Sequence, residues 1–206
     1  MVVETQQEDS GVLHITLRDP KKRNALGIAM FDGIDAGLSQ VTSSVKCVLL
    51  SGDGSAFCSG FDMKACATDI SILGTYITRL SALTRSLRRL PMPVVCAAHG
   101  GAIAGGCAIL TGCDFVVGSR DGKYGYPVPR IGISPAVTIP TLFQKLVHGR
   151  ARSLLMSGEI VAGTKAFSIG LLSHLEDSNE QVLPRANELA ESLAQKPPHA
   201  MQTTKQ

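Results

Sequence analysis

The sequence predicts an α/β layered fold, and two observations support that prediction. Short apolar runs typical of strands alternate along the chain with longer segments in which apolar residues recur every three or four positions. The 206 residues are 44% apolar and 18% charged, a composition that allows a sizeable buried core and excludes a disordered chain. No internal repeat or linker interrupts the pattern, so we expect a single domain.

The elements predicted for the first part of the chain are a strand, a helix and a second strand. Residues 11–17 alternate between apolar and other side chains, and Asp19 and Pro20 then end the strand. Residues 47–50 form a continuous apolar run, as expected of a strand that is buried on both faces. Between these strands, a helix is indicated by four apolar residues at helical spacing: Phe31, Ile34, Leu38 and Val41.

The middle of the chain contains the clearest helical pattern. Apolar residues recur at helical spacing over residues 70–90, arginines lie between them, and two prolines then end the helix. Residues 94–98 predict another buried strand, residues 104–113 a core helix and residues 114–117 a fourth strand.

The last part of the chain is predicted to be mainly helical from Val137 onward, and an amphipathic segment extends from Glu180 to Gln195. The pair Pro197 and Pro198 closes that segment. We therefore expect the domain to span residues 1–197 and residues 198–206 to form a short tail.

Charge and composition narrow the possible functions. The net charge of +3 without a block of like charges, and an aromatic content of 4%, argue against a nucleic-acid surface. No apolar stretch reaches the length of a membrane span and the N-terminus has no secretory signal, so we expect no membrane partner and a cytoplasmic location. The six cysteines never have the spacing of a zinc site, so we expect buried, reduced thiols and no metal.

Two strand-to-helix turns have an unusual composition, whereas the P-loop, Rossmann, hydrolase-elbow and zincin motifs are absent. The first turn is SGDGSAFCSGFDMK at residues 51–64, and the second is HGGAIAGG at residues 99–106. Glycine-rich turns before a helix leave backbone N–H groups unpaired. Two such groups aimed at one point would form an oxyanion hole.

Five segments with characteristic residues follow one another along nearly the whole chain: 19–26 (DPKKRNAL), 56–63 (AFCSGFDM), 100–114, 124–135 (YGYP followed by Gly132 and Pro135) and 149–171. In this order and spacing they closely resemble the crotonase family, the enoyl-CoA hydratase/isomerase superfamily. The resemblance implies a core of repeated ββα units with a helical C-terminal part. Family members usually continue beyond the point where this chain stops, so we expect that part to be truncated.

The resemblance also implies roles for individual residues. The N–H groups of Phe61 and Gly105 match the two donors that hold a thioester carbonyl oxygen as it becomes an enolate. Lys22 and Arg23 match the segment beside the adenine and phosphates of coenzyme A. The other residues that would line the bound thioester are Ala25, Gly60, Asp62, Met63 and Lys64, with Phe61 among them.

The acid and base positions are where the chain departs from the family. Ala108 and Val128 stand where hydratases of the family place their two glutamates, and Ala136 stands where some isomerases place one. Because hydration needs proton transfer, we expect hydration to be very slow. Tyr126 and His99 are the weak candidates for a replacement catalytic role. Asp62 and Asp114 are expected to be structural hydrogen-bonding residues.

These observations predict a protein similar to enoyl-CoA hydratases and isomerases. It would bind an acyl-CoA or acyl-carrier thioester and stabilise its enolate. Coenzyme A would be part of the substrate, with no tightly bound cofactor. Two alternatives stay open: a catalytically silent acyl-CoA-binding or regulatory protein, and another crotonase reaction such as decarboxylation or thioester hydrolysis. The resemblance also implies a homotrimer or hexamer, unless truncation prevents assembly.

Overall fold

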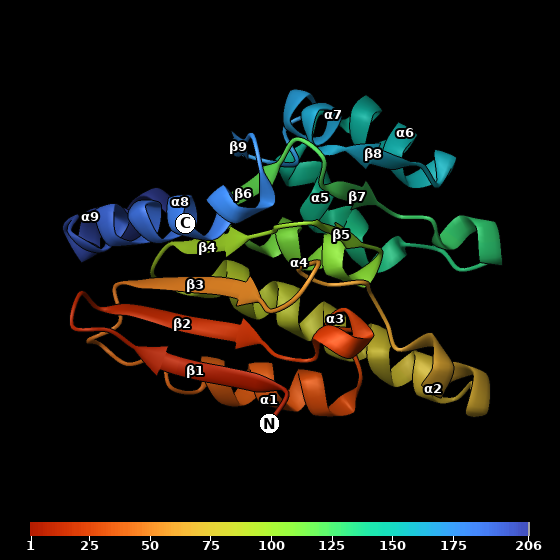
Figure 1. Ribbon diagram of the computed structural model, residues 1–206, viewed down its shortest axis with the longest axis horizontal. Coiled ribbons are helices and arrows are strands. Elements are labelled where there is room, and N and C mark those ends of the chain that lie inside the picture. Colours follow the sequence, from red (N-terminus) through yellow and green to blue (C-terminus); the bar gives the residue numbers. More distant parts are fainter. Residues whose placement is uncertain (206) are drawn as a thin grey trace.

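A six-stranded sheet forms the centre of the molecule in the computed structural model, which describes residues 1–205 (Figure 1). Its strand order is β1-β2-β3-β4-β6-β9. Only β1 is antiparallel to its neighbour, and the other neighbouring strands run parallel. The strands are β1 (Val3–Gln7), β2 (Val12–Leu17), β3 (Cys47–Gly52), β4 (Val94–Ala97), β6 (Phe115–Ser119) and β9 (His174–Glu176).

Both faces of this sheet are covered by helices. Successive side chains of a strand point to opposite sides, so each strand contributes to the core on both faces. In β3, Val48 and Leu50 pack into the large core, whereas Cys47 and Leu49 pack into a smaller core beneath one helix. This arrangement explains the continuous apolar run that predicted a buried strand. The large core includes residues of α1 (Ile28–Leu38), α3 (Ile72–Arg89) and α4 (Gly105–Gly112), and the smaller core lies under α8 (Asn179–Ala194).

A second, three-stranded sheet positions the glycine-rich turns. It has the order β5-β7-β8, made of β5 (Gly101–Ile103), β7 (Lys123–Gly125) and β8 (Ile160–Ala162). The chain thus repeats a unit of two strands and a helix, as in β1-β2-α1 and β4-β5-α4, which confirms the predicted α/β fold of ββα units. The remaining helices outside the C-terminal end are α2 (Met63–Thr68), α5 (Ile139–Lys145), α6 (His148–Ser157) and α7 (Gly163–Ser168).

The segment expected to be a short tail is a helix instead. Residues Pro198–Lys205 form α9, and Gln206 lies outside the described residues. The Lys205 ammonium donates to the carbonyl oxygens of Leu87 (3.2 Å) and Met92 (2.9 Å) and lies 2.7 Å from the carboxylate of Asp114. Asp114 also accepts the backbone N–H of Val94 at 2.8 Å, the structural role expected for it. The two prolines therefore separate two packed helices.

The other predicted elements match the structure closely, and the differences concern short or separate pieces. The helix predicted over residues 70–90 is α3, preceded by the unpredicted α2. Strand β1 and the three-residue strands β5, β7, β8 and β9 were not predicted. All six cysteines are buried and free. Among the described helices, none combines the length and apolar character that a membrane crossing requires.

Candidate functional site

The two glycine-rich turns predicted from the sequence lie against each other. Cys58 of the first turn forms a parallel bridge with Ala102 of β5, and the Ile103 N–H donates to the Cys58 carbonyl at 3.0 Å. The first turn is held on its other side by Leu26, whose N–H donates to the Gly60 carbonyl at 2.7 Å. Three segments that are far apart in the sequence are therefore fixed relative to one another by backbone hydrogen bonds.

Asn24 connects the first two of these segments. Its side chain is completely buried, accepts the Asp19 N–H at 2.8 Å and donates to the carbonyls of Asp53 (2.9 Å) and Ala56 (3.0 Å). Asn24 has φ 53°, a left-handed conformation that asparagine tolerates better than most residues. No sequence pattern indicated this structural role, although Asn24 lies in a segment that carries the family resemblance.

The amides of Phe61 and Gly105 occupy the contact between the two turns. Among residues 1–205, neither amide donates a hydrogen bond to another backbone group. A Cβ atom placed on Gly60 would lie 3.4 Å from the Gly105 nitrogen, and one placed on Gly105 would lie 3.3 Å from the Phe61 ring. The two predicted donors therefore lie in adjoining turns, and neither amide is used by another backbone group of the described residues.

The backbone before Gly105 is held in an unfavourable conformation. Ala104 has φ 50° and ψ −111°, where a residue with a Cβ atom is strained. The Ala104 N–H donates to the Gly125 carbonyl at 2.8 Å, which helps to hold this conformation. Gly105 then begins α4, whose residues are all buried, so the positive end of the helix dipole lies in an apolar environment. This end of the helix favours a ligand atom that carries negative charge.

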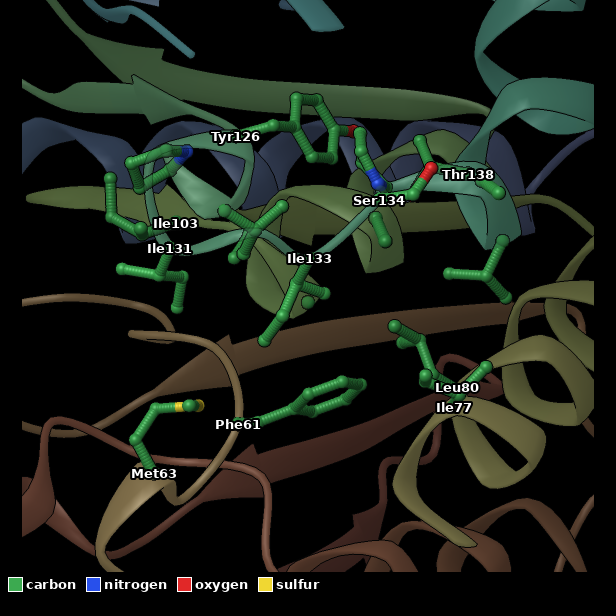
Figure 2. A pocket seen from close by; sticks show the side chains of 18 of the residues that line it. Phe61, Met63, Ile77, Leu80, Ile103, Tyr126, Ile131, Ile133, Ser134 and Thr138 are labelled. Atoms are coloured by element: carbon green, nitrogen blue, oxygen red, sulfur yellow. The ribbon is translucent and has the colours of Figure 1, made fainter. Parts of the chain in front are cut away.

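A cavity of about 400 Å³ opens beside these amides (Figure 2). The first turn and α3 form one side, and the segment after β7 forms the other. Figure 2 shows Phe61, Met63, Ile77 and Leu80 facing Tyr126 and Thr138 across it. The lining residues are Ser59, Phe61, Met63, Ile77, Leu80, Ile103, Ala104, Gly105, Ala108, Tyr126, Pro127, Val128, Arg130, Ile131, Ile133, Ser134, Pro135, Ala136, Val137 and Thr138.

The lining is almost free of groups that can transfer a proton. The structure brings Ala108, Val128 and Ala136 to the wall of one cavity, and these are the three positions where the resemblance places glutamates. Within residues 1–205, no carboxylate, histidine, lysine or cysteine lines the cavity. Arg130 is its one charged side chain, and that residue is exposed.

Tyr126 lies in the cavity wall, as a replacement catalyst would have to. Only 1% of the residue is exposed, and its hydroxyl has no hydrogen-bond partner among the described residues. Burial raises the pKa of Tyr126 well above its usual value, and the neighbouring Cys107 raises that pKa further. The phenol is therefore neutral near pH 7 and unsuited to act as a general base.

His99 lies outside this cavity. Its imidazole Nε2 lies 2.9 Å from the Gly54 carbonyl, and the His99 carbonyl accepts the Phe57 N–H at 2.9 Å. These contacts fit a residue that holds the first turn in place rather than one that acts on a ligand.

The residues predicted to contact the thioester or coenzyme A differ in where they lie. Phe61 and Met63 line the cavity, whereas Lys22, Arg23 and Lys64 are exposed near the first turn. Gly60 shapes that turn with φ 90°, and the half-buried Ala25 accepts the Gly27 N–H at 3.1 Å.

Lys22 and Asp62 form an ion pair at the edge of the site, with 2.8 Å between Nζ and Oδ2. Asp62 also caps α2 by accepting the Ala65 N–H at 3.4 Å. The Lys22 ammonium, above all, holds the pKa of the Asp62 carboxyl below its usual value. Asp62 thus has the structural role expected for it, and Lys22 is already paired with a carboxylate.

Comparisons with known proteins identify the family of this chain. The sequence model of the enoyl-CoA hydratase/isomerase family matches residues 7–206. A "putative enoyl-CoA hydratase" of Thermus thermophilus is 30% identical over 98% of this chain and 81% of its own length. The "1,2-epoxyphenylacetyl-CoA isomerase" of Escherichia coli is 30% identical over 96% of this chain and 78% of its own length.

Solved structures give the same result. The crystal structure of an enoyl-CoA hydratase of Mycobacterium smegmatis aligns with a TM-score of 0.92 and 25% identity, over 100% of this chain and 81% of that one. A putative enoyl-CoA hydratase from Streptomyces coelicolor aligns with a TM-score of 0.89 and 29% identity, over 100% of this chain and 77% of that one. On the sequence match and the shared fold, the chain belongs to the enoyl-CoA hydratase/isomerase family.

Proposed function

We propose that the protein binds an acyl-CoA thioester in the 400 Å³ cavity and holds its carbonyl oxygen with the amides of Phe61 and Gly105. The observation that carries this proposal is the pair of neighbouring amides, both free of backbone acceptors, beside an apolar cavity. Two N–H donors and the N-terminus of α4 would stabilise the negative charge that develops on the oxygen when an enolate forms. Because the donors are backbone groups, a phenylalanine at position 61 preserves them.

Coenzyme A enters this proposal as part of the substrate. Its phosphates carry negative charge, and Arg23 and Lys64 supply exposed positive charge near the first turn. Lys22 lies beside them, with its ammonium paired to the Asp62 carboxylate. An acyl-carrier thioester would present the same carbonyl group on a different carrier. The binding assay should therefore compare the affinities for acyl-CoA and for the acyl-carrier thioester.

Hydration is the reaction that the cavity supports least. Addition of water to an enoyl thioester needs one group to activate the water and one to protonate the α-carbon. Ala108, Val128 and Ala136 supply neither, and Tyr126 is a neutral phenol with a raised pKa. A non-catalytic acyl-CoA-binding role is the second function that this observation favours. Decarboxylation or thioester hydrolysis would be the alternative reactions of an intact oxyanion site.

The test combines binding and turnover on the same sample. Calorimetry would measure the affinity for octanoyl-CoA and for free coenzyme A, and loss of enoyl absorbance would measure hydration of crotonyl-CoA and trans-2-octenoyl-CoA. We expect the thioester to bind more tightly than free coenzyme A. The turnover rate for hydration should lie far below the roughly 10–10³ s⁻¹ that is typical of efficient enzymes. Absence of thioester binding would refute the site. Rapid hydration would show that other residues transfer the protons.

A further inference from the structure

The cavity has an open end and a closed end. At one end, Ile131 is 61% exposed and Met63 is 44% exposed, whereas Leu80 and Thr138 at the other end are each 1% exposed. Figure 2 shows the first two side chains toward one end of the cavity and the last two toward the opposite end, with Phe61 between them. A ligand that enters past Met63 would therefore extend its far end into a closed space.

The closed end is mainly apolar. The buried Leu80 and the half-buried Ile77 lie there with Thr138, as Figure 2 shows. Val137, Ala108 and Ala136 are further apolar residues of the cavity lining. The Tyr126 hydroxyl is completely covered by other protein atoms and is therefore not accessible to a ligand. A cavity with such a lining favours apolar groups of a ligand over polar ones. The part of the ligand beyond the carbonyl is thus expected to be a hydrocarbon without polar substituents.

The volume limits the length of that hydrocarbon. An apolar cavity of about 150 Å³ holds one benzene ring, so 400 Å³ has room for on the order of 16 carbon-sized atoms. In the proposed binding mode, the thioester group and the adjoining end of the coenzyme A arm would occupy the region at the mouth. The space that is left corresponds to a chain of about eight to ten carbons.

Phe61 narrows the cavity beside the carbonyl position. Its ring lies 5.5 Å from the Tyr76 ring, centroid to centroid, at an interplanar angle of 52°, and Tyr76 is itself buried. The same ring lies 3.3 Å from the position of a Cβ atom on Gly105. A branch on the carbon next to the carbonyl would meet this ring, whereas a linear chain can pass it.

From this shape we infer that the site selects unbranched, unsubstituted acyl chains of about eight to ten carbons over short, branched or long ones. The inference rests on the proposed function and adds the class of acyl group to it. Selection comes from burial of methylene groups, which is worth about fourfold in affinity for each fully buried methylene.

A chain-length series on the wild-type protein tests this directly. Dissociation constants would be measured for butanoyl-, hexanoyl-, octanoyl-, decanoyl- and hexadecanoyl-CoA, with the longest kept below its micelle concentration. We expect octanoyl-CoA to bind on the order of 100-fold more tightly than butanoyl-CoA, and hexadecanoyl-CoA no more tightly than decanoyl-CoA. 2-Methyloctanoyl-CoA should bind at least about tenfold more weakly than octanoyl-CoA.

A variant of the cavity lining sharpens the test. Val137→Trp reduces the volume of the cavity, so the chain length of tightest binding should become shorter than in the wild type. Val147 is 73% exposed and does not line the cavity, so Val147→Trp serves as the matched control and should keep the wild-type profile. Thermal unfolding of both variants verifies that they fold. If Val137→Trp fails to fold, the wild-type series still decides the question.

The two proposals fail in different ways. Equal affinity for all chain lengths, or steadily increasing affinity up to hexadecanoyl-CoA, would overturn the inferred selectivity and leave thioester binding in place. Failure of every thioester to bind more tightly than free coenzyme A would overturn the proposed function, and the inferred selectivity with it.

Discussion

The two sides of the cavity are built in different ways. On one side, the amides of Phe61 and Gly105 are positioned by backbone hydrogen bonds, by the buried Asn24 side chain and by the strained Ala104. On the other side, the segment from Tyr126 to Thr138 presents side chains, and its character depends on which side chains these are. A backbone N–H group is kept in most substitutions of its residue, whereas a single substitution of an acidic residue removes its carboxylate. Carbonyl binding can therefore persist in a chain that lacks the groups for proton transfer.

The largest expected effect is on catalytic activity, and it comes from adding carboxyl groups to the cavity lining. Ala108→Glu combined with Val128→Glu would place two carboxyl groups in a cavity that already contains both amides. General acid–base catalysis contributes about 10²–10⁴-fold, so hydration of crotonyl-CoA or trans-2-octenoyl-CoA should rise by at least about 10²-fold. The Ala108→Gln, Val128→Gln double variant has nearly the same shape without the carboxyl groups and is the control. If the glutamate variant still binds octanoyl-CoA but gains no activity, the protein is not a hydratase that has merely lost its catalysts.

A large effect on stability is expected when the hydrogen bonds that position the first turn are removed. Asn24→Ala removes three hydrogen bonds and leaves an N–H and two carbonyls without their partner. The free energy of unfolding should fall by about 3–5 kcal/mol, measured by urea denaturation. The matched control is Asn187→Ala in α8, because the side-chain oxygen of Asn187 is buried without a partner. This substitution should change stability by less than about 1 kcal/mol. Equal losses in the two variants would show that the Asn24 contacts do not hold the turns.

The smallest effect concerns two buried tyrosines. Tyr126→Phe removes a hydroxyl without a partner and should raise the melting temperature by about 2–4 °C, with no loss of octanoyl-CoA binding. Tyr124→Phe removes a hydroxyl that donates to the Ala98 carbonyl at 2.7 Å and should lower the melting temperature. Differential scanning calorimetry distinguishes the two. Loss of turnover or binding in the Tyr126 variant would instead indicate that its hydroxyl contacts the ligand.

The sequence predicted the elements that have a strong periodic pattern. The run at residues 47–50 and the helix ending before Pro91 correspond to β3 and α3, because burial on both faces and a single apolar stripe leave clear signals. Three-residue strands such as β5 leave no such signal, since pairing with β7 rather than composition defines them. The helix α9 was missed because two prolines were interpreted as an end, whereas Pro198 is at its first position, where proline is well tolerated.

The site was predictable as far as it depends on turns that have a recognisable sequence. The glycine-rich turns before helices indicated unpaired amides, and the family resemblance identified Phe61 and Gly105 as the two donors. The wall formed by Ile77, Leu80 and Val137 was not found, because apolar residues that line a cavity have the same sequence pattern as residues that fill a core. The pairing of Lys22 with Asp62 joins residues 40 positions apart, and no local pattern indicates it.

The measurement that tests the central claim most directly is the carbonyl stretching frequency of a bound thioester. Isotope-edited infrared difference spectra of octanoyl-CoA with ¹³C at the carbonyl would compare the free and bound forms. Two hydrogen bonds from the amides of Phe61 and Gly105, with the N-terminus of α4 behind them, should lower the frequency on binding. The shift should be the same in Tyr126→Phe, because backbone groups cause it. A bound thioester whose carbonyl frequency equals that of the free thioester would contradict the account.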